Sequence, residues 1–135
     1  MRAPAGRGGP LVLPGRFRAA VFDFDGLLVD SEPGWGRAER LLLERHGRRQ
    51  TDADRAATIG RSIDETIEIH LASIGDPSVT GQVLKAELLE LARAEYRTGP
   101  PIRPGAAELV AALAGRIPIG LASNTYGALV AEALA

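Results

Sequence analysis

Two aspartates separated by one residue, Asp23 and Asp25, follow a short apolar run and precede Gly26. Two carboxylates this close raise the free-energy cost of ionising each other, so a fold keeps such a pair where a cation or a reaction uses it. A calcium-binding EF-hand loop also begins Asp-x-Asp, but its glycine stands at the sixth position and a helix precedes it. Here the glycine stands at the fourth position and a strand is predicted before it, which excludes that kind of loop.

Two interpretations of the aspartate pair remain. Aspartate at a strand end can serve only to form a turn. Alternatively, one carboxylate can attack phosphorus and form an acyl phosphate, which divides one difficult displacement into two. Because carboxylate and phosphate are both anions, a divalent cation must then bridge them. A second carboxylate two residues along a strand points to the same side, where it can protonate the leaving oxygen and later take a proton from water.

The elements that must position this pair are predicted from apolar periodicity. Two runs, at 18–23 and 117–122, are typical of parallel strands that are buried on both faces. Ser31 is expected to cap the first helix, and Ser62 with Glu65 forms a predicted capping box. Helices are predicted at 33–47, 52–58, 62–74, 79–98 and 105–115, and from 126 towards the C-terminus.

This order of elements predicts an α/β fold built on one βαβ crossover with a large helical insertion. Ligands of such sheets bind beyond the carboxyl ends of the strands. Asp23 and Asp25 follow the first predicted strand, and Ser123 and Asn124 follow the second. Because polar side chains follow both strands at the same sheet edge, the phosphate-transfer interpretation of Asp23 and Asp25 is favoured over the interpretation that they only form a turn.

Composition excludes several classes of partner. The formal net charge is -1 at pH 7, which gives no electrostatic reason to expect nucleic acid or an anionic membrane. The chain has no cysteine, so disulfides and thiolate metal sites are excluded and a reducing, cytoplasmic location is expected. No apolar run is long enough to span a membrane. Residues 1–17, rich in glycine, proline and arginine, are expected to form a flexible basic tail.

The stretch VFDFDGLLVDSEP at 21–33 resembles the first motif of the haloacid dehalogenase superfamily. The chain looks most similar to its sugar-phosphate and phosphoglycolate phosphatases, which carry a helical cap directly after that motif. The resemblance covers residues 18–135 and includes Ile59-Gly60-Arg61-Ser62, Pro104-Gly105 and the second motif LASNT at 121–125. It implies a partial Rossmann-like core at 18–31 and 103–135 and a mobile cap at 32–102.

The resemblance also implies roles for individual residues. Asp23 is expected to be the nucleophile and Asp25 the general acid and base. The Asp23 carboxylate and the Asp25 backbone carbonyl are expected to hold Mg²⁺. Ser123, with Asn124 beside it, is expected to bind the transferring phosphoryl group. Arg61 lies in the cap loop and either contacts substrate or is a solvated arginine.

The chain departs from the family pattern after Ser123. The family uses a later lysine to neutralise phosphate and nucleophile, and a later acidic pair to complete the Mg²⁺ shell. The single lysine, Lys85, precedes Ser123. Glu132 is the single acidic residue after Ser123. The chain therefore looks like the first part of a longer enzyme, with an open strand edge, weak Mg²⁺ binding and little turnover expected.

The resemblance thus implies a Mg²⁺-dependent phosphomonoester hydrolase that acts on a small phosphorylated metabolite through an aspartyl phosphate. A sugar phosphomutase is the enzyme alternative, although Trp35 stands where similar mutases tend to carry histidine. A dehalogenase is disfavoured because Asp25 belongs to the phosphate branch. A non-catalytic remnant of the same family is the alternative from another class. The sequence leaves the substrate and the oligomeric state open.

Overall fold

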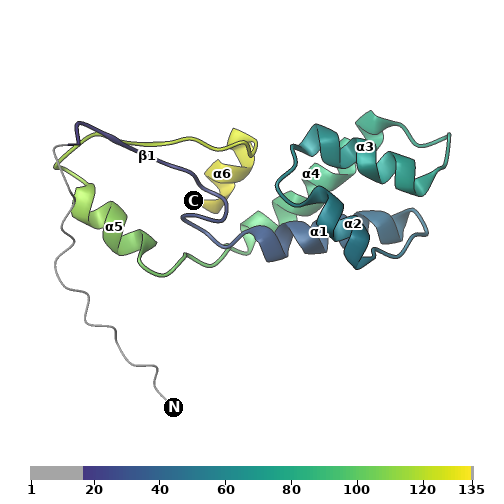
Figure 1. Cartoon of the computed structure of the whole chain (residues 1–135), viewed down its shortest axis with the longest axis horizontal. Helices are drawn as coiled ribbons and strands as arrows, with labels where there is room; N and C mark the ends of the chain where they lie inside the picture. The colour runs from purple at the N-terminus through teal and green to yellow at the C-terminus, as the bar shows by residue number, and fades with distance from the viewer. Residues whose placement is uncertain (1–16, 135) are drawn as a thin grey trace, which may run out of the picture.

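The computed structural model describes residues 17–134 (Figure 1). The tail expected at 1–17 therefore lies outside the described residues, apart from Phe17. The elements are β1 (Ala20–Phe22), α1 (Glu32–Arg45), α2 (Asp52–Thr58), α3 (Ile63–Ile74), α4 (Gly81–Arg97), α5 (Ala106–Leu113), β2 (Ile119–Leu121) and α6 (Gly127–Ala133). Every predicted helix and strand is present, with bounds that differ by a few residues. The α/β class predicted from the sequence is confirmed.

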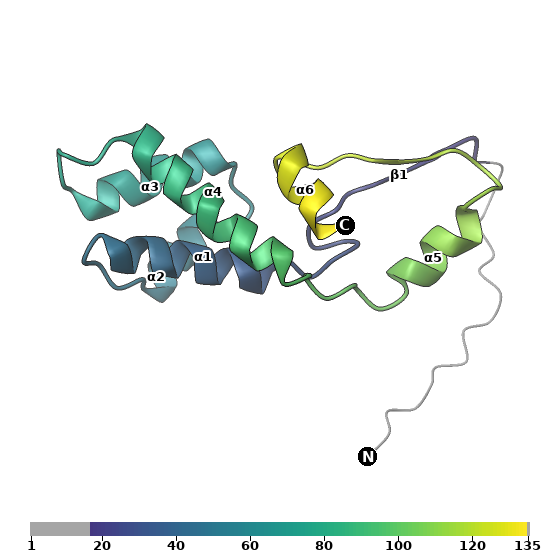
Figure 2. The same ribbon diagram turned by 180° about the vertical axis from the view of Figure 1, so that it is seen from behind.

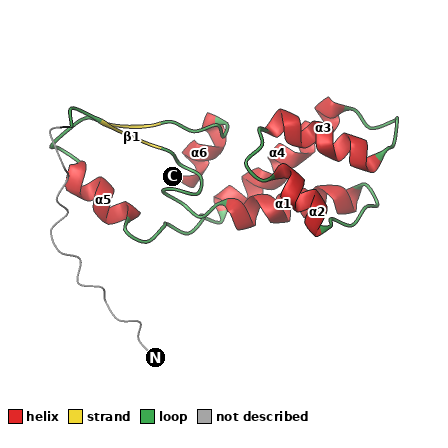
Figure 3. Ribbon diagram, viewed as in Figure 1, coloured by secondary structure: helices red, strands yellow, loops and turns green. Residues whose placement is uncertain are grey.

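Strands β1 and β2 pair in parallel, as predicted, in the register Ala20↔Ile119 to Phe22↔Leu121 (Figure 3). The expectation that both faces of the strands are buried is wrong. Val21 is 70% exposed, and every residue of β2 is exposed. Within residues 17–134 the sheet has only two strands, so too few neighbours are present to cover its faces.

Helices α1 to α4 form a block at one end of the molecule, and the strands with α5 lie at the other (Figures 1 and 2). Helix α1 packs along α4, and α3 packs on α4 from another side. The packing buries one side of each helix, as the apolar spacing predicts. Fully buried members of this core include Ala38, Leu42, Leu84 and Leu88.

Capping residues fix where the shorter helices begin. The predicted capping box of Ser62 and Glu65 starts α3, and a second box, Thr51 with Asp54, starts α2. The prediction for Ser31 is wrong in its mechanism. Ser31 precedes α1, but its backbone is already helical (φ -86, ψ -16) and its side chain makes no capping hydrogen bond. Pro33 in the first turn lacks an N–H, which leaves one donor fewer to cap.

The two connections between the strands and the helical block lie side by side. Asp30 N donates to Pro101 O at 2.7 Å, and Arg103 N donates to Leu28 O at 2.8 Å. Val29 and Ile102 form an antiparallel bridge between these hydrogen bonds. The chain therefore enters and leaves the helical block through one narrow, paired segment. Within residues 17–134, none of the helices combines the length and apolarity needed to cross a bilayer.

Candidate active site

A tight turn after β1 presents the two aspartates. Gly26 adopts a positive φ of 76, a region that residues with a side chain rarely enter. The turn closes when Leu28 N and Val29 N both donate to Phe24 O, at 3.0 and 3.1 Å. Phe24, between the two aspartates, is buried beneath the turn at 1% exposure, and Asp25 is half-buried. Asp23 is exposed, and one of its carboxylate oxygens accepts from Phe24 N at 2.8 Å.

The loop after β2 meets this turn. Ala122 N donates to Phe22 O at 2.8 Å, which extends the parallel pairing up to the end of both strands. Ser123 Oγ then donates to Asp25 Oδ2 at 3.2 Å and accepts from Thr125 N at 3.0 Å. Asn124 follows Ser123 in this loop and is exposed. The structure thus brings together the aspartates and Ser123, which the sequence placed at one sheet edge.

Tyr96, near the end of α4, is a site residue that the sequence did not indicate. Its hydroxyl donates to Asp25 Oδ1 and accepts from Trp35 Nε1 at 3.1 Å. Its side chain is 3% exposed. Burial, and then the hydrogen bond to the Asp25 carboxylate, raise the pKa of Tyr96 to about 12. The phenol therefore stays protonated and can donate to Asp25 over the whole physiological pH range.

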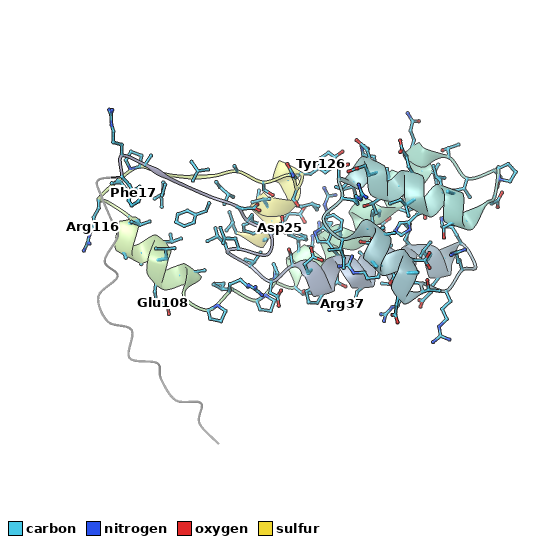
Figure 4. All side chains as sticks on the ribbon, viewed as in Figure 1. Phe17, Asp25, Arg37, Glu108, Arg116 and Tyr126 are labelled. Carbon is cyan, nitrogen blue, oxygen red and sulfur yellow. The ribbon has the colours of Figure 1, made fainter. Side chains whose placement is uncertain are left out.

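A cavity of about 230 Å³ lies between the aspartate turn and the helical block. Asp23, Asp25, Ser123 and Asn124 line one side of it, and residues of α1 to α4 and the loop at 59–62 line the other. Figure 4 shows Asp25 in the middle of the molecule, between the sheet and the helical block. Arg61 lines the cavity too, so this predicted residue lies within reach of a ligand bound at the aspartates.

The helical side of the cavity holds a group of hydrogen-bonded polar and charged side chains that the sequence did not indicate. Glu39 is 3% exposed and accepts from Arg55 Nη1 at 2.9 Å and from Thr58 Oγ1 at 2.6 Å. The ring of His70, fully buried, lies 3.4 Å from the same carboxylate. All of these but His70 line the cavity. Buried charges of this kind are retained only when paired, and Arg55 supplies the pair here.

The residues present suit a sparsely ligated Mg²⁺. Within residues 17–134 no cluster of three or more His, Cys, Asp or Glu side chains could hold a metal. Mg²⁺, however, commonly keeps several waters and takes only one or two carboxylates plus substrate phosphate. Asp23 is exposed and lines the cavity, so its carboxylate fits that requirement.

Lys85 lies elsewhere. Its Nζ is 2.6 Å from Asp64 Oδ1 and stands over the Tyr126 ring, 5.6 Å from the centroid. The hydrogen bond from Lys85 to Asp64 raises the pKa of the lysine to about 12. Lys85 is not among the residues that line the cavity. Lys85 therefore does not serve as the phosphate-neutralising lysine that the resemblance implies.

The sequence profile of the haloacid dehalogenase-like hydrolases matches residues 17–135. The chain therefore belongs to the haloacid dehalogenase-like hydrolase family, as its motifs predicted. A hexitol phosphatase B of Escherichia coli (strain K12) is 33% identical over 102 residues, which make up 73% of this chain and 45% of that protein. The chain thus spans about half the length of the curated relatives it matches.

Two solved structures show the same fold. A Thermotoga maritima protein provisionally named β-phosphoglucomutase has a TM-score of 0.69 at 24% identity, over 87% of this chain and 55% of that one. A Bacillus subtilis protein provisionally assigned as a hydrolase of this family has a TM-score of 0.66 at 17% identity, over 89% of this chain and 59% of that one. That structure is described as bound to magnesium and as revealing interdomain movement.

Proposed function

We propose that this chain carries the nucleophile, the acid/base and a phosphate-binding hydroxyl of a Mg²⁺-dependent phosphomonoester hydrolase. The observation that supports this most is the hydrogen bond from Ser123 Oγ to Asp25 Oδ2 at 3.2 Å. It joins two motifs 98 residues apart in the chain, at the carboxyl ends of both strands. Asp23 lines the same cavity. The hexitol phosphatase relative supports a phosphate ester as the substrate.

The proposed reaction proceeds in two displacements at phosphorus. An oxygen of Asp23 attacks the phosphorus, the bond to the alcohol oxygen breaks, and the phosphoryl group remains on Asp23 as an acyl phosphate. Asp25 gives its proton to the departing oxygen. In the second displacement the Asp25 carboxylate takes a proton from water, which attacks the acyl phosphate and releases inorganic phosphate. Both aspartates return to their starting states.

Other residues orient this chemistry. Ser123 would bind an oxygen of the transferring phosphoryl group, with Asn124 beside it. The Asp23 carboxylate and the Asp25 carbonyl would hold Mg²⁺, which when bound supplies the positive charge that two approaching anions require. The hydroxyl of Tyr96 holds Asp25 in place. The magnesium described in the Bacillus subtilis structure supports this choice of ion.

The helical block at 32–102 would act as a cap that closes over the substrate and excludes water. The cavity lined by both parts supports this division, as does the paired connection at 28–31 and 101–103. The core would then comprise 18–31 and 103–135. Arg61 would contact the part of the substrate that lies away from the phosphate.

Release of p-nitrophenol from p-nitrophenyl phosphate, with and without Mg²⁺, tests the proposal. We expect slow turnover, because no lysine within residues 17–134 lines the cavity. Asp23→Asn should reduce the Mg²⁺-dependent rate to background, because an amide cannot attack phosphorus. Asp52→Asn is the matched control, since Asp52 is exposed in the first turn of α2 and does not line the cavity. Equal rates for the unaltered chain and Asp23→Asn would contradict the assignment of the nucleophile.

A further inference from the structure

The loop at 59–62 joins α2 to α3 and lines the cavity. All four of its residues are exposed, so burial of its own side chains does not hold it in place. At its first end, Ile59 N donates to Arg55 O at 3.3 Å. Arg61 N donates to Thr58 O at 3.0 Å. Where the loop stands in the cavity therefore depends on how the two flanking helices are held.

One buried carboxylate, that of Glu39 on α1, contacts both of these helices. Its Oε1 accepts from Arg55 Nη1 at 2.9 Å, and its Oε2 accepts from Thr58 Oγ1 at 2.6 Å, both on α2. On α3, His70 Nε2 lies 3.4 Å from the same Oε2. Thr58 is the last residue of α2, so its hydroxyl is bound directly before the loop begins. Glu39 thus connects α1 to the helices on either side of the loop.

Glu39 has little capacity to bind a ligand itself. Its side chain is almost fully buried, and each of its two oxygens already accepts a hydrogen bond. Stability alone does not account for a carboxylate at this place, because apolar side chains of similar volume often replace a buried ion pair without loss of stability. A buried carboxylate does provide direction, since its donors have to approach the oxygens along favourable lines. The bonds to Glu39 therefore orient the end of α2.

Arg55 adds a second attachment between α1 and α2. Its Nη2 donates to Glu32 Oε2 at 2.5 Å and to Glu32 O at 3.2 Å. Glu32 is the first residue of α1, roughly two helical turns before Glu39. Two attachments at different heights along α1 oppose rotation of α2 about either one. The end of α2, and the loop that follows it, are therefore fixed relative to α1.

We propose that Glu39 is a positioning residue of this site, whose buried carboxylate sets where the loop at 59–62 stands over the aspartates. Side chains that support a binding loop from behind determine how accurately the loop meets its ligand. A displaced loop should weaken substrate binding more than it slows the chemical step, because Asp23 and Asp25 lie on the other side of the cavity. The effect on catalysis rests on the proposed function, whereas the effect on the loop does not.

Amide hydrogen exchange of the 135-residue chain, followed by NMR, tests the placement of the loop without a ligand. The reporter amides are those of Ile59 and Arg61, which donate to backbone oxygens at the end of α2. Thr58→Val removes the hydroxyl but keeps the shape of the side chain, and Glu39→Met removes both acceptor oxygens. We expect each variant to speed exchange at the two amides about tenfold, through the loss of a buried hydrogen bond to a carboxylate.

Thr58 Oγ1 also lies 3.1 Å from Arg55 O in its own helix, so a double-mutant cycle is needed to separate that contact from the bond to Glu39. If the bond to Glu39 positions the loop, Thr58→Val should add less than about twofold in the Glu39→Met background. Glu39→Gln, which keeps the size and one acceptor oxygen, replaces Glu39→Met if that variant does not fold. It should give smaller changes in the same direction.

Two further variants control the measurement. Thr58→Ser keeps the hydroxyl and should leave exchange within about twofold of that in the unaltered chain. Thr98→Val is the matched control. Thr98 also makes a hydroxyl hydrogen bond at the end of a helix, to Glu95 O at 2.6 Å, and it does not line this cavity. It should leave the two reporter amides unchanged.

Rates with p-nitrophenyl phosphate and Mg²⁺ test the effect on the site. We expect Glu39→Met and Thr58→Val to raise KM about fivefold and to change kcat by less than about twofold. Thr58→Ser should restore both constants. A fall in kcat at unchanged KM would overturn the positioning role, because the chemical step and not the loop would then depend on Glu39.

The outcomes separate the inference from the function. Unchanged exchange at Ile59 and Arg61 in both Thr58→Val and Glu39→Met overturns the inference. A full additional effect of Thr58→Val in the Glu39→Met background overturns it as well. If exchange changes as expected but the unaltered chain releases no p-nitrophenol, the proposed function fails, and the placement of the loop by Glu39 stands.

Discussion

The carboxylate of Asp25 is held by two hydroxyl donors from distant parts of the chain. Tyr96 comes from the last turn of α4, and Ser123 follows β2. Trp35 in turn donates to the Tyr96 oxygen at 3.1 Å. A side chain held in this way has few accessible orientations, which is what an acid/base needs if it is to meet a substrate oxygen at a fixed place. Tyr96 therefore acts as a positioning residue for Asp25.

Removal of the Tyr96 hydroxyl tests the strength of this arrangement. We expect Tyr96→Phe to lower the free energy of unfolding by about 1–2 kcal/mol, because a buried hydrogen bond to a carboxylate is lost and Trp35 Nε1 loses its acceptor. Urea unfolding followed by circular dichroism measures the change. Tyr126→Phe is the control, since Tyr126 is 43% exposed. Equal losses in the two variants would show that the Tyr96 hydroxyl makes no special contribution.

The capping box of Thr51 and Asp54 stabilises the start of helix α2. The Asp54 carboxylate accepts from Thr51 Oγ1 at 2.7 Å and from Thr51 N at 2.8 Å, and Arg48 Nη2 lies 3.0 Å away. The bonds from Thr51, with a smaller contribution from Arg48, lower the pKa of Asp54 from 3.8 to about 2. The charged form is therefore the one that stabilises the helix start. Helix α2 carries Arg55 and Thr58 to the cavity, so its start affects the site.

The lowered pKa predicts a pH-dependent stability. A carboxyl whose pKa falls on folding contributes its stability above the unfolded value, near 4, and loses it as pH falls towards 2. We expect Asp54→Asn to cost about 1 kcal/mol at pH 6 and almost nothing at pH 2. Urea unfolding at both pH values measures the difference. A cost that is the same at pH 2 and pH 6 would refute this account of Asp54.

The sequence predicted the elements and the meeting of the strand ends because those depend on local patterns. Ser62 and Glu65 are three residues apart, and parallel strands place Asp25 and Ser123 at one edge whatever else the fold does. The hydroxyl of Tyr96 and the pairing of Arg55 with Glu39 depend on how helices cross. Periodicity shows which face of a helix is buried, but not which side chain it meets.

At the scale of the whole molecule, one apolar core joins the parts. Phe24 beneath the aspartate turn, Leu88 of α4 and Leu129 of α6 belong to the same buried cluster. Helix α6 also places Glu132 within 2.9 Å of Arg93 and 3.2 Å of Arg97 on α4. If the helical block moves as the proposed cap, it has to separate these surfaces, and this contact then contributes to the free energy of opening.

Truncation of a side chain in that contact should destabilise both parts together. Leu129 is 2% exposed, and we expect Leu129→Ala to cost about 2–4 kcal/mol. Thermal unfolding gives the loss, and amide hydrogen exchange should show faster exchange in both α4 and α6. Leu134→Ala is the control, because Leu134 is 69% exposed. If exchange changes in α6 alone, the two parts do not share a core.

The paired connection at 28–31 and 101–103 has a wider consequence. Its hydrogen bonds, from Asp30 N to Pro101 O and from Arg103 N to Leu28 O, already bring the two ends of the intervening chain together. These hydrogen bonds therefore offset the entropic cost of bringing the two ends of the insertion together. That cost depends only weakly on the number of residues between the ends. A different insertion, longer or shorter, could be joined at the same two points, provided that it supplies a group in place of Tyr96 to hold Asp25 and an apolar surface to cover Phe24. The paired connection therefore fixes where the helical block begins and ends, independently of the number of residues that lie between the two points.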